Sequence, residues 1–352
     1  MEWNELYKML ELGDLEGQVQ ALYPQWEISF FDMIKLVIEG RGIELLGKIQ
    51  EGIWQNLNRE WTNWKSVIIT IAIVILISAV FSSFKGAFKN QQIEEIAFYV
   101  NYLILIILFT SLFQQTLKEA EDTLIQIKEF MQVFFPAYFL VLGIAAGTAT
   151  GVVYYQLACL VIYGVEIILE AFLLPAVSGY VLFSIMNGIW EESRLLLLLE
   201  LWRKGIKAGL RLLLGILTGA GLIQSMITPV IERIKTEAVY KTVEALPGVG
   251  ELTEGVMRLW LGSAVLIKNS VGIIFSILLL GITLFPLLKI AAAGCILKGM
   301  AAVLGIAGDK RMIQLTNNMG DGILLLLKTV AYGILFFLVL IAITAYTTNG
   351  GF

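Results

Sequence analysis

The most constraining feature of this 352-residue sequence is a series of long intervals without a charged residue. The longest runs from Phe130 to Val165. Others cover 66–84, 96–117, 171–190, 212–231, 269–288 and 329–352, and a weaker one, which Lys298 interrupts, covers 290–308. Charged residues make up 15% of the chain, against about 25% in soluble domains. Because a helix needs about 20 apolar residues to cross hydrocarbon, the intervals predict an all-α, polytopic helical membrane protein with seven to nine transmembrane helices.

The interval from Phe130 to Val165 is long enough for two crossings. Small residues within it, Gly143, Gly147, Thr148 and Gly151, predict a hairpin between the two crossings. The charged segment 114–130 just before it is predicted to form a loop on the outer side of the membrane.

The chain divides into a polar N-terminal segment, 1–65, and a transmembrane domain, 66–350. The first segment has more Asp and Glu than Lys and Arg, and we expect it to be extracytoplasmic. Ile34, Val37 and Ile38 begin an apolar stripe at helical spacing that continues to Leu57, which predicts amphipathic helices. Such a stripe packs on the bundle, the membrane interface or a partner. Charged residues interrupt residues 1–20, which therefore do not resemble a signal peptide.

Basic residues suggest an orientation for the first half of the chain. Lys85 and Lys89 lie in one short loop, and Arg203, Lys207 and Arg211 lie four residues apart in another. Short loops rich in Lys and Arg prefer the cytoplasm. The three residues of the second loop predict an interfacial helix whose basic face contacts anionic lipid.

Two segments resemble each other and suggest an internal repeat. FLLPAVSGYVLFSIMNG ends at Gly188 and TLFPLLKIAAAGCILKG ends at Gly299, each with a proline near the start of a crossing. Units 152–231 and 259–346, with three crossings each, would insert with opposite topology, as in many transporters. The alternative is that apolar segments resemble each other by composition alone.

Several function classes are excluded or disfavoured. There is no histidine, so there is no imidazole base or ligand, and no GxxxxGK[ST] pattern is present. Both cysteines, Cys159 and Cys295, lie in apolar runs, which disfavours a disulfide framework or a thiolate metal site. The net charge of −4 offers no basic field for nucleic acid. We therefore expect no catalytic residues, no cofactor and no metal.

Lys268 and Asn269 are the most informative polar residues, because they lie within an apolar segment. If a span begins near Trp260, Lys268 lies about 12 Å along its axis, where a charge pairs, reaches the interface or faces water. In that case Lys268 and Asn269 line a conduit or contact a partner. If the span begins near Val271, Lys268 lies at the interface instead.

Glu166 and Glu170 lie one helical turn apart and share a face. A carboxylate pair at this spacing can bind a cation or carry protons. The simpler alternative, which we favour, is that both residues cap a span just before Pro175. The amides of Asn101, Gln156, Asn187 and Gln224 are predicted to be buried and to hydrogen-bond between helices.

The most distinctive stretch is VEALPGVGELTEGVMRLWLGSAVLIKNSVGIIF, residues 243–275. Pro247, Gly248 and Gly250 mark a turn there, and Gly262 and Gly272 follow on a presumed helix. Together with the preceding ITPVIERIKTEAVYK and the later FPLLKIAAAGCILK, this stretch closely resembles the stage III sporulation protein AE family. The resemblance covers nearly the whole chain from about residue 25.

The resemblance implies a multi-pass protein of the outer, mother-cell-derived forespore membrane. It also implies partners: the other proteins of the stage III sporulation A operon, including an ATPase and ring-forming subunits, and a forespore-side channel partner. Together they would form a channel or feeding apparatus between the two compartments, so we expect an oligomer or hetero-complex in the lipid bilayer. No catalytic residues are attached to this family. The alternatives are an autonomous secondary transporter of a small solute and a pure assembly scaffold.

Overall fold

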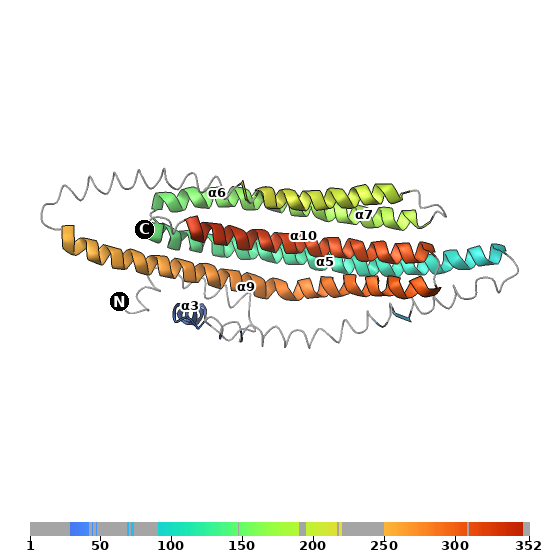
Figure 1. Ribbon diagram of the computed structural model, residues 1–352, viewed down its shortest axis with the longest axis horizontal. Coiled ribbons are helices and arrows are strands. Elements are labelled where there is room, and N and C mark those ends of the chain that lie inside the picture. Colours follow the sequence, from blue (N-terminus) through green and yellow to red (C-terminus); the bar gives the residue numbers. More distant parts are fainter. Residues whose placement is uncertain are drawn as a thin grey trace.

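A computed structural model describes residues 29–41, 44, 47, 69, 72, 73, 91–146, 148–189, 195–216, 218, 219, 250–307 and 310–347. Every element in these ranges is helical, which confirms that the fold is all-α. The long helices form an elongated bundle with their axes close to the long axis of the molecule (Figure 1).

Two helices, α5 (Gln91–Ala146) and α9 (Gly250–Ala307), run along most of the bundle. They contain 56 and 58 residues, so each is on the order of 85 Å long, well above the roughly 30 Å of hydrocarbon that a span must cross. Pro136 lies inside α5 and Pro286 inside α9, and neither ends its helix.

A second rod consists of α6 (Thr148–Ile167), the π-helical segment η1 (Ile168–Leu173) and α7 (Leu174–Asn187). Pro175, in the first turn of α7, has no N–H to donate to the preceding turn. The helix widens just before it, and the N–H of Leu174 bonds to the carbonyl of Leu169, five residues back. The wider turn carries the rod past the proline without a break.

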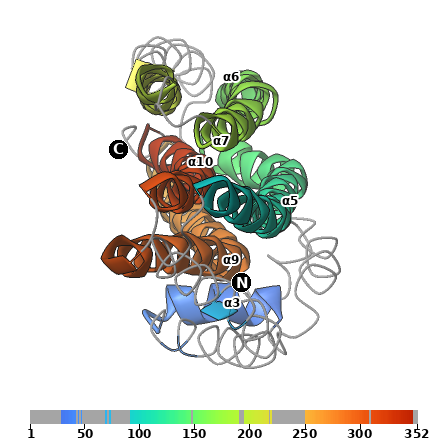
Figure 2. The ribbon, with the colours of Figure 1, turned by 90° about the vertical axis from the view of Figure 1, so that its right-hand side faces the viewer.

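The final helix, α10 (Lys310–Thr347), lies among α5, α7 and α9 when the bundle is viewed from its end (Figure 2). It runs antiparallel to α9 and parallel to α5. In the parallel pair Phe98 lies beside Arg311, and Leu124 lies close to Gly333. Residues of α5 and α10 at the same level are therefore about 210 positions apart. A further helix over 196–216 packs on the bundle through Leu199, Ile206 and Leu210.

The short helix α3 (Phe30–Ile38) crosses the bundle at α9 (Figure 1). Met33 and Ile34 of α3 are buried, and Val37 packs against the core. Gly40 follows the helix with a φ of 75°, which suits glycine, and the N–H of Arg41 bonds to the carbonyl of Leu36 across this turn. The rest of the predicted N-terminal stripe lies outside the described residues.

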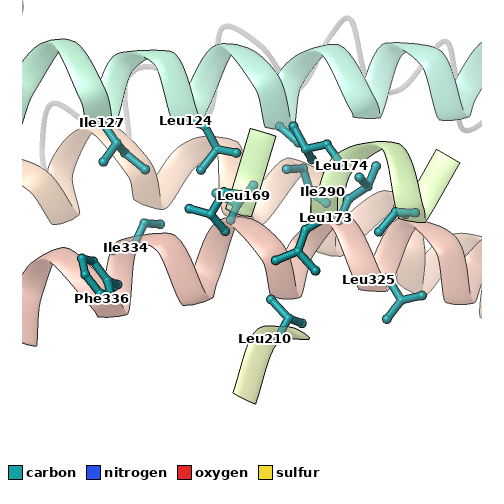
Figure 3. Close-up of a cluster of buried hydrophobic side chains, with 14 of the residues drawn as sticks. Leu124, Ile127, Leu169, Leu173, Leu174, Leu210, Ile290, Leu325, Ile334 and Phe336 are labelled. Carbon is teal, nitrogen blue, oxygen red and sulfur yellow. The ribbon is translucent and has the colours of Figure 1, made fainter. Parts of the chain in front are cut away.

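The core is formed by leucine, isoleucine and phenylalanine side chains from all the long helices. In one buried cluster, Leu124 of α5, Leu169 and Leu173 of η1, and Ile334 of α10 converge (Figure 3). Nearer the hairpin end of α5, the rings of Phe130 and Phe134 pack against Phe275 of α9, with the Phe134 and Phe275 centroids 5.0 Å apart.

Among the described residues, four helical segments are long and apolar enough to cross a membrane: Phe98–Pro136, Tyr155–Asn187, Asn269–Gly305 and Lys310–Ala345. The predicted count of seven to nine is not confirmed. Most residues of the predicted spans 66–84 and 212–231 lie outside the described part of the chain, and separate predicted spans merge into single helices. The predicted loop 114–130 is wrong, because this segment is part of α5.

The hairpin predicted at Gly143–Gly151 is present. Helix α5 ends at Ala146 and α6 begins at Thr148, and the two helices lie antiparallel (Figure 1). The inverted repeat is not confirmed. The rod from α6 to α7 and helix α9 run in the same direction along the bundle, whereas inverted copies would run in opposite directions.

Candidate functional site

Asp321 of α10 is the centre of a charged cluster that joins three helices. Its Oδ1 lies 2.7 Å from Nζ of Lys298 on α9, and its Oδ2 lies 3.3 Å from Nη1 of Arg203 on the 196–216 helix. Lys298 also donates a hydrogen bond of 2.7 Å to Oδ1 of Asn317. Two cations thus share one carboxylate, which leaves one positive charge in excess.

The backbone of α10 beside Asp321 approaches its neighbours closely. A Cβ atom at Gly320 would lie 3.2 Å from the Lys298 stem, and one at Gly322 would lie 2.4 Å from Val181 of α7. The absence of side chains at these two glycines therefore lets α7, α9 and α10 meet around the cluster.

Two further ion pairs link helices of the same bundle. Nζ of Lys289 on α9 lies 3.2 Å from Oε1 of Glu119 on α5 and 4.5 Å from the centre of the Phe285 ring. Lys128 of α5 pairs with Glu166 of α6. Each pair gives a charge in an apolar bundle a partner of opposite sign, and removing one member leaves the other uncompensated.

At the end of the bundle where α10 begins, the guanidinium of Arg311 lies 3.5 Å from the centre of the Phe98 ring. Nearby, Nδ2 of Asn101 is 3.7 Å from the sulfur of Met312. Both contacts join α5 to α10.

The charged contacts occur at intervals along the axis of the bundle. The Glu119 and Lys128 pairs lie level with about residues 328 and 337 of α10, in addition to Arg311 and Asp321 on α10 itself. Successive levels are about 10 to 15 Å apart at 1.5 Å per residue. Because hydrocarbon is about 30 Å thick, at least one level lies within it wherever α10 crosses. Charged groups at such depth are paired and typically mark functional pathways.

The two carboxylates predicted to act as a pair, Glu166 and Glu170, have different surroundings. Glu166 forms the ion pair with Lys128, so it does not act as a simple cap. Glu170 lies in η1, half-buried, without an ion-pair partner among the described residues. Among those residues no group of three or more His, Cys, Asp or Glu side chains is placed to hold a metal ion.

Lys268 and Asn269 both lie in the continuous helix α9, next to the start of the candidate span. The side chain of Lys268 is outside the described part of the structure. The Oδ1 atom of Asn269 is buried and has no hydrogen-bond partner within that part, and the same holds for the hydroxyl of Tyr138 across from α9. One turn further along α9, a Cβ atom at Gly272 would lie 3.3 Å from that hydroxyl, so a glycine at this position accommodates Tyr138.

The other predicted signature residues are less informative. Gly250 is the first residue of α9, and Gly262 lies within this helix. Pro247 and Gly248 lie outside the described residues.

The three basic residues at 203, 207 and 211 do not act as one lipid-facing row. Arg203 pairs with Asp321 while remaining partly exposed, Lys207 is half-buried and Arg211 is exposed. The interfacial role therefore remains a prediction for Arg211 and Lys207 and does not describe Arg203.

Two of the predicted buried amides lie between helices as expected. Besides Asn101, Asn187 is buried and its Oδ1 accepts a hydrogen bond of 2.9 Å from the N–H of Leu195. Gln156 is exposed, so the prediction that it is buried is wrong. Gln224 lies outside the described residues.

Sequence patterns did not predict that Asp321, Lys298, Lys289 and Glu119 pair between helices. A signal was present in Lys298, which is the charge that weakens the predicted span 290–308. Its partners lie on other helices, and spacing along one helix does not reveal them.

A polar stripe lies on the outer side of α5, in the segment where charge alone predicts a loop. Six exposed residues at helical spacing form this α5 stripe: Gln115, Lys118, Glu121, Asp122, Gln126 and Glu129. The apolar residue Ile125 is exposed among them. In contact with lipid at the centre of a membrane, each of the four charges would cost about 3 kcal/mol, on the order of 10 kcal/mol together.

Comparisons with known proteins agree with the resemblance carried by residues 243–275. The stage III sporulation protein AE family matches residues 28–348 of the chain. The chain is 22% identical over 279 residues to stage III sporulation protein AE of Bacillus subtilis (strain 168), covering 79% of this chain and 69% of that protein. No solved structure matches this chain. Because this family match covers nearly the whole chain, the chain belongs to the stage III sporulation protein AE family.

Proposed function

We propose that this protein is a non-enzymatic membrane subunit of a sporulation channel, which forms or supports a conduit between mother cell and forespore. Membership of the family links the chain to sporulation. The observation that carries the conduit role is the series of ion pairs between apolar helices, centred on Asp321, Lys298 and Arg203. A helix that only anchors a protein has no need of charges at hydrocarbon depth, whereas a transport path does.

The proposal includes a location and partners. The protein acts in the outer forespore membrane, together with the other proteins of the stage III sporulation A operon. These comprise an ATPase and ring-forming subunits, and a forespore-side protein completes the channel. The four candidate spans are compatible with a multi-pass position in that membrane.

The test of this proposal is compartment-specific complementation in an endospore-forming host. A deletion strain should form few heat-resistant spores. Expression of the gene from a promoter active only in the mother cell should restore them, and expression only in the forespore should not. Rescue from the forespore alone, or normal sporulation of the deletion strain, would contradict the proposal.

Lys268 provides a narrower test of the conduit role. Lys268→Leu should insert normally but lower the yield of heat-resistant spores about tenfold or more, because a charge at a conduit wall or partner contact is lost. The matched control is Lys204→Leu, which removes an exposed lysine of the 196–216 helix and should leave the yield unchanged. Normal sporulation of the Lys268→Leu strain would remove this residue from the conduit.

The two alternatives predict different results. An autonomous transporter, purified and reconstituted alone in liposomes, would move a small solute down its gradient. The inverted repeat that suggested this alternative is not confirmed, which weakens it. A pure scaffold would still recruit its partners when polar residues of its helices are neutralised, and would support sporulation without an aqueous path.

A further inference from the structure

The side of the bundle away from the α5 stripe is basic. Lys207 and Arg211 follow Arg203 at intervals of four residues, and Arg203 contacts Asp321, so this row of cations lies beside α10. Lys328 is exposed on α10 and follows Asp321 by seven residues, which places it on the same side of that helix. We call Lys207, Arg211 and Lys328 the basic face. None of the three forms an ion pair within the described part of the chain.

The basic face and the α5 stripe point in different directions. Gly322 marks the side of α10 that faces α5 and α7. Lys328 lies six residues later, about 120° around the helix from that side. On α5, Leu124 approaches Gly333 of α10, and Asp122 lies about 160° around the helix from Leu124. Seen from the end of the bundle, α5 and α10 occupy different sides (Figure 2), so the two charged surfaces face away from each other.

The two surfaces lie at the same level along the bundle. The contact of α5 with Gly333 places Asp122 level with about residue 331 of α10. The 196–216 helix runs parallel to α10, and its Gly209 approaches Leu173 of η1, which lies level with about residue 329 of α10. Arg211, two residues after Gly209, therefore also lies near the level of Asp122.

The two surfaces are complementary in charge and each contains an exposed apolar residue. The stripe carries three carboxylates and one ammonium group, a net charge of −2, whereas the basic face carries three cations. Glu200 is the one carboxylate in the described part of the 196–216 helix, so the cations remain in excess. Ile125 in the stripe is 45% exposed, and Leu335, two turns beyond Lys328 on the same side of α10, is 43% exposed. Ile125 and Leu335 also lie at one level, so a contact between the surfaces would bury an apolar pair inside a charged rim.

We propose that the α5 stripe of one copy packs against the basic face of a second copy of this chain in the same membrane. Copies inserted in one membrane have the same orientation and depth, so surfaces at one level of the bundle meet when two copies lie side by side. The attraction operates wherever this level lies, because it steers association in water and compensates buried charge in lipid. The inference goes beyond the proposed channel role and does not depend on it.

The contact that the charges favour is head-to-tail. A two-fold contact between two stripes would bring carboxylates against carboxylates, and one between two basic faces would bring cations against cations, and both arrangements are repulsive. A contact between unlike surfaces leaves one stripe and one basic face free in every dimer, so further copies add in the same way. Such heterologous contacts close into a ring or extend as an open row.

Cross-linking in membranes tests this arrangement on the full chain. The exposed native thiols are first removed as Cys159→Ala and Cys295→Ala. Gln126→Cys in the stripe and Leu335→Cys beside the basic face are then introduced into one chain, which is treated with a short bis-maleimide. Because the two positions face away from each other within one copy, the expected product is a ladder of dimers, trimers and larger species.

Two kinds of control belong to this experiment. Each single-cysteine variant should give little cross-linked product, because a head-to-tail contact joins two different positions. The matched double variant combines Gln126→Cys with Phe172→Cys, a residue of η1 that is 66% exposed at a similar level. It should yield at least about fivefold less trimer than the pair with Leu335→Cys, because η1 is not part of the basic face.

Exchanging the charges provides a second test, which measures how much of one tagged copy purifies with a differently tagged copy. One variant carries Glu121→Lys and Asp122→Lys in the stripe, and the other carries Arg211→Glu and Lys328→Glu in the basic face. Either variant alone sets like charges against each other, so co-purification should fall about fivefold or more. A mixture of the two variants should recover the original level, because each reversed surface then meets an oppositely charged one. That recovery also shows that both variants fold.

Three outcomes would overturn the inference. If the double-cysteine variant with Leu335→Cys yields dimers alone, the contact is not head-to-tail. If the Phe172→Cys control gives an equal ladder, the cross-links do not report these surfaces. If the mixture of charge-exchanged variants associates no better than either alone, the basic face is covered by another group, such as the anionic lipid predicted for Lys207 and Arg211. The complementation test is independent of self-association, so a failure here would leave the role of the subunit in sporulation unaffected.

Discussion

Helices α5 and α10 lie side by side and run in the same direction, yet most of the polar residues that connect α10 to its neighbours lie at a different level from the α5 stripe. Arg311, Asn317 and Asp321 lie in the first third of α10 and contact neighbouring helices, whereas Lys328 near its middle is exposed. The polar residues of the α5 stripe lie near the middle of its helix and are exposed. In this bundle, charged side chains such as Asp321 therefore connect helices, whereas those of the α5 stripe form a polar surface.

The strongest test of this comparison is to neutralise one aspartate on each helix. Asp321→Asn leaves Arg203 and Lys298 without their shared carboxylate, and we expect a loss of about 2 kcal/mol in the free energy of unfolding. This is below the usual cost of breaking a fully buried pair because both cations are partly exposed. Asp122→Asn should change stability by less than about 0.5 kcal/mol. Thermal unfolding in detergent, followed by circular dichroism, measures both, and equal losses would refute the assignment of two different roles.

A second test concerns the close approach of α10 to α7. A Cβ atom at Gly322 would lie 2.4 Å from Cγ2 of Val181, so Gly322→Ala should cost about 1.5 kcal/mol through overpacking. A second substitution, Val181→Ala, should recover part of this loss. The matched control is Gly299→Ala, which meets open space in α9 and should be neutral or stabilising by up to about 1 kcal/mol. If both alanines behaved alike, the tight contact around Asp321 would be wrong.

The smallest expected effect contrasts two glutamates of α5 itself. Glu119→Gln removes the carboxylate that pairs with Lys289, whose side chain is 15% exposed, and we expect a loss of about 1 kcal/mol. Glu121→Gln, two residues away on the outer side, should have no measurable effect on unfolding. Combining Glu119→Gln with Lys289→Met should restore most of the stability. An unchanged melting temperature for Glu119→Gln would show that the inner side of α5 is no more dependent on charge pairing than the outer side.

Part of this architecture was predictable from local features. The charge-free intervals identify a helical membrane protein, and small residues locate the turn between α5 and α6. The helix ends were not predictable from charge. Gln115, Lys118 and Glu119 are polar but are also good helix formers, so α5 continues through the segment 114–130, where hydropathy alone predicts a loop.

The site was less predictable than the fold. The sequence marks Glu166 as an informative residue but does not identify its partner Lys128, and it predicts a lipid-facing Arg203 when this residue pairs with Asp321. An ion pair between helices depends on which faces meet and at what axial offset. Spacing within a single helix contains neither quantity.

The amino-acid sequence by itself determined the solvent and the class of fold, because long apolar intervals require lipid and a lipid-exposed backbone must satisfy its hydrogen bonds internally. It also determined membership of the family, through the pattern of residues across 28–348. Only the tertiary structure decided which charges are paired inside the bundle and which remain on the α5 stripe. The reason is geometric: whether a carboxylate faces a cation, lipid or water depends on how the helices are rotated and offset against each other.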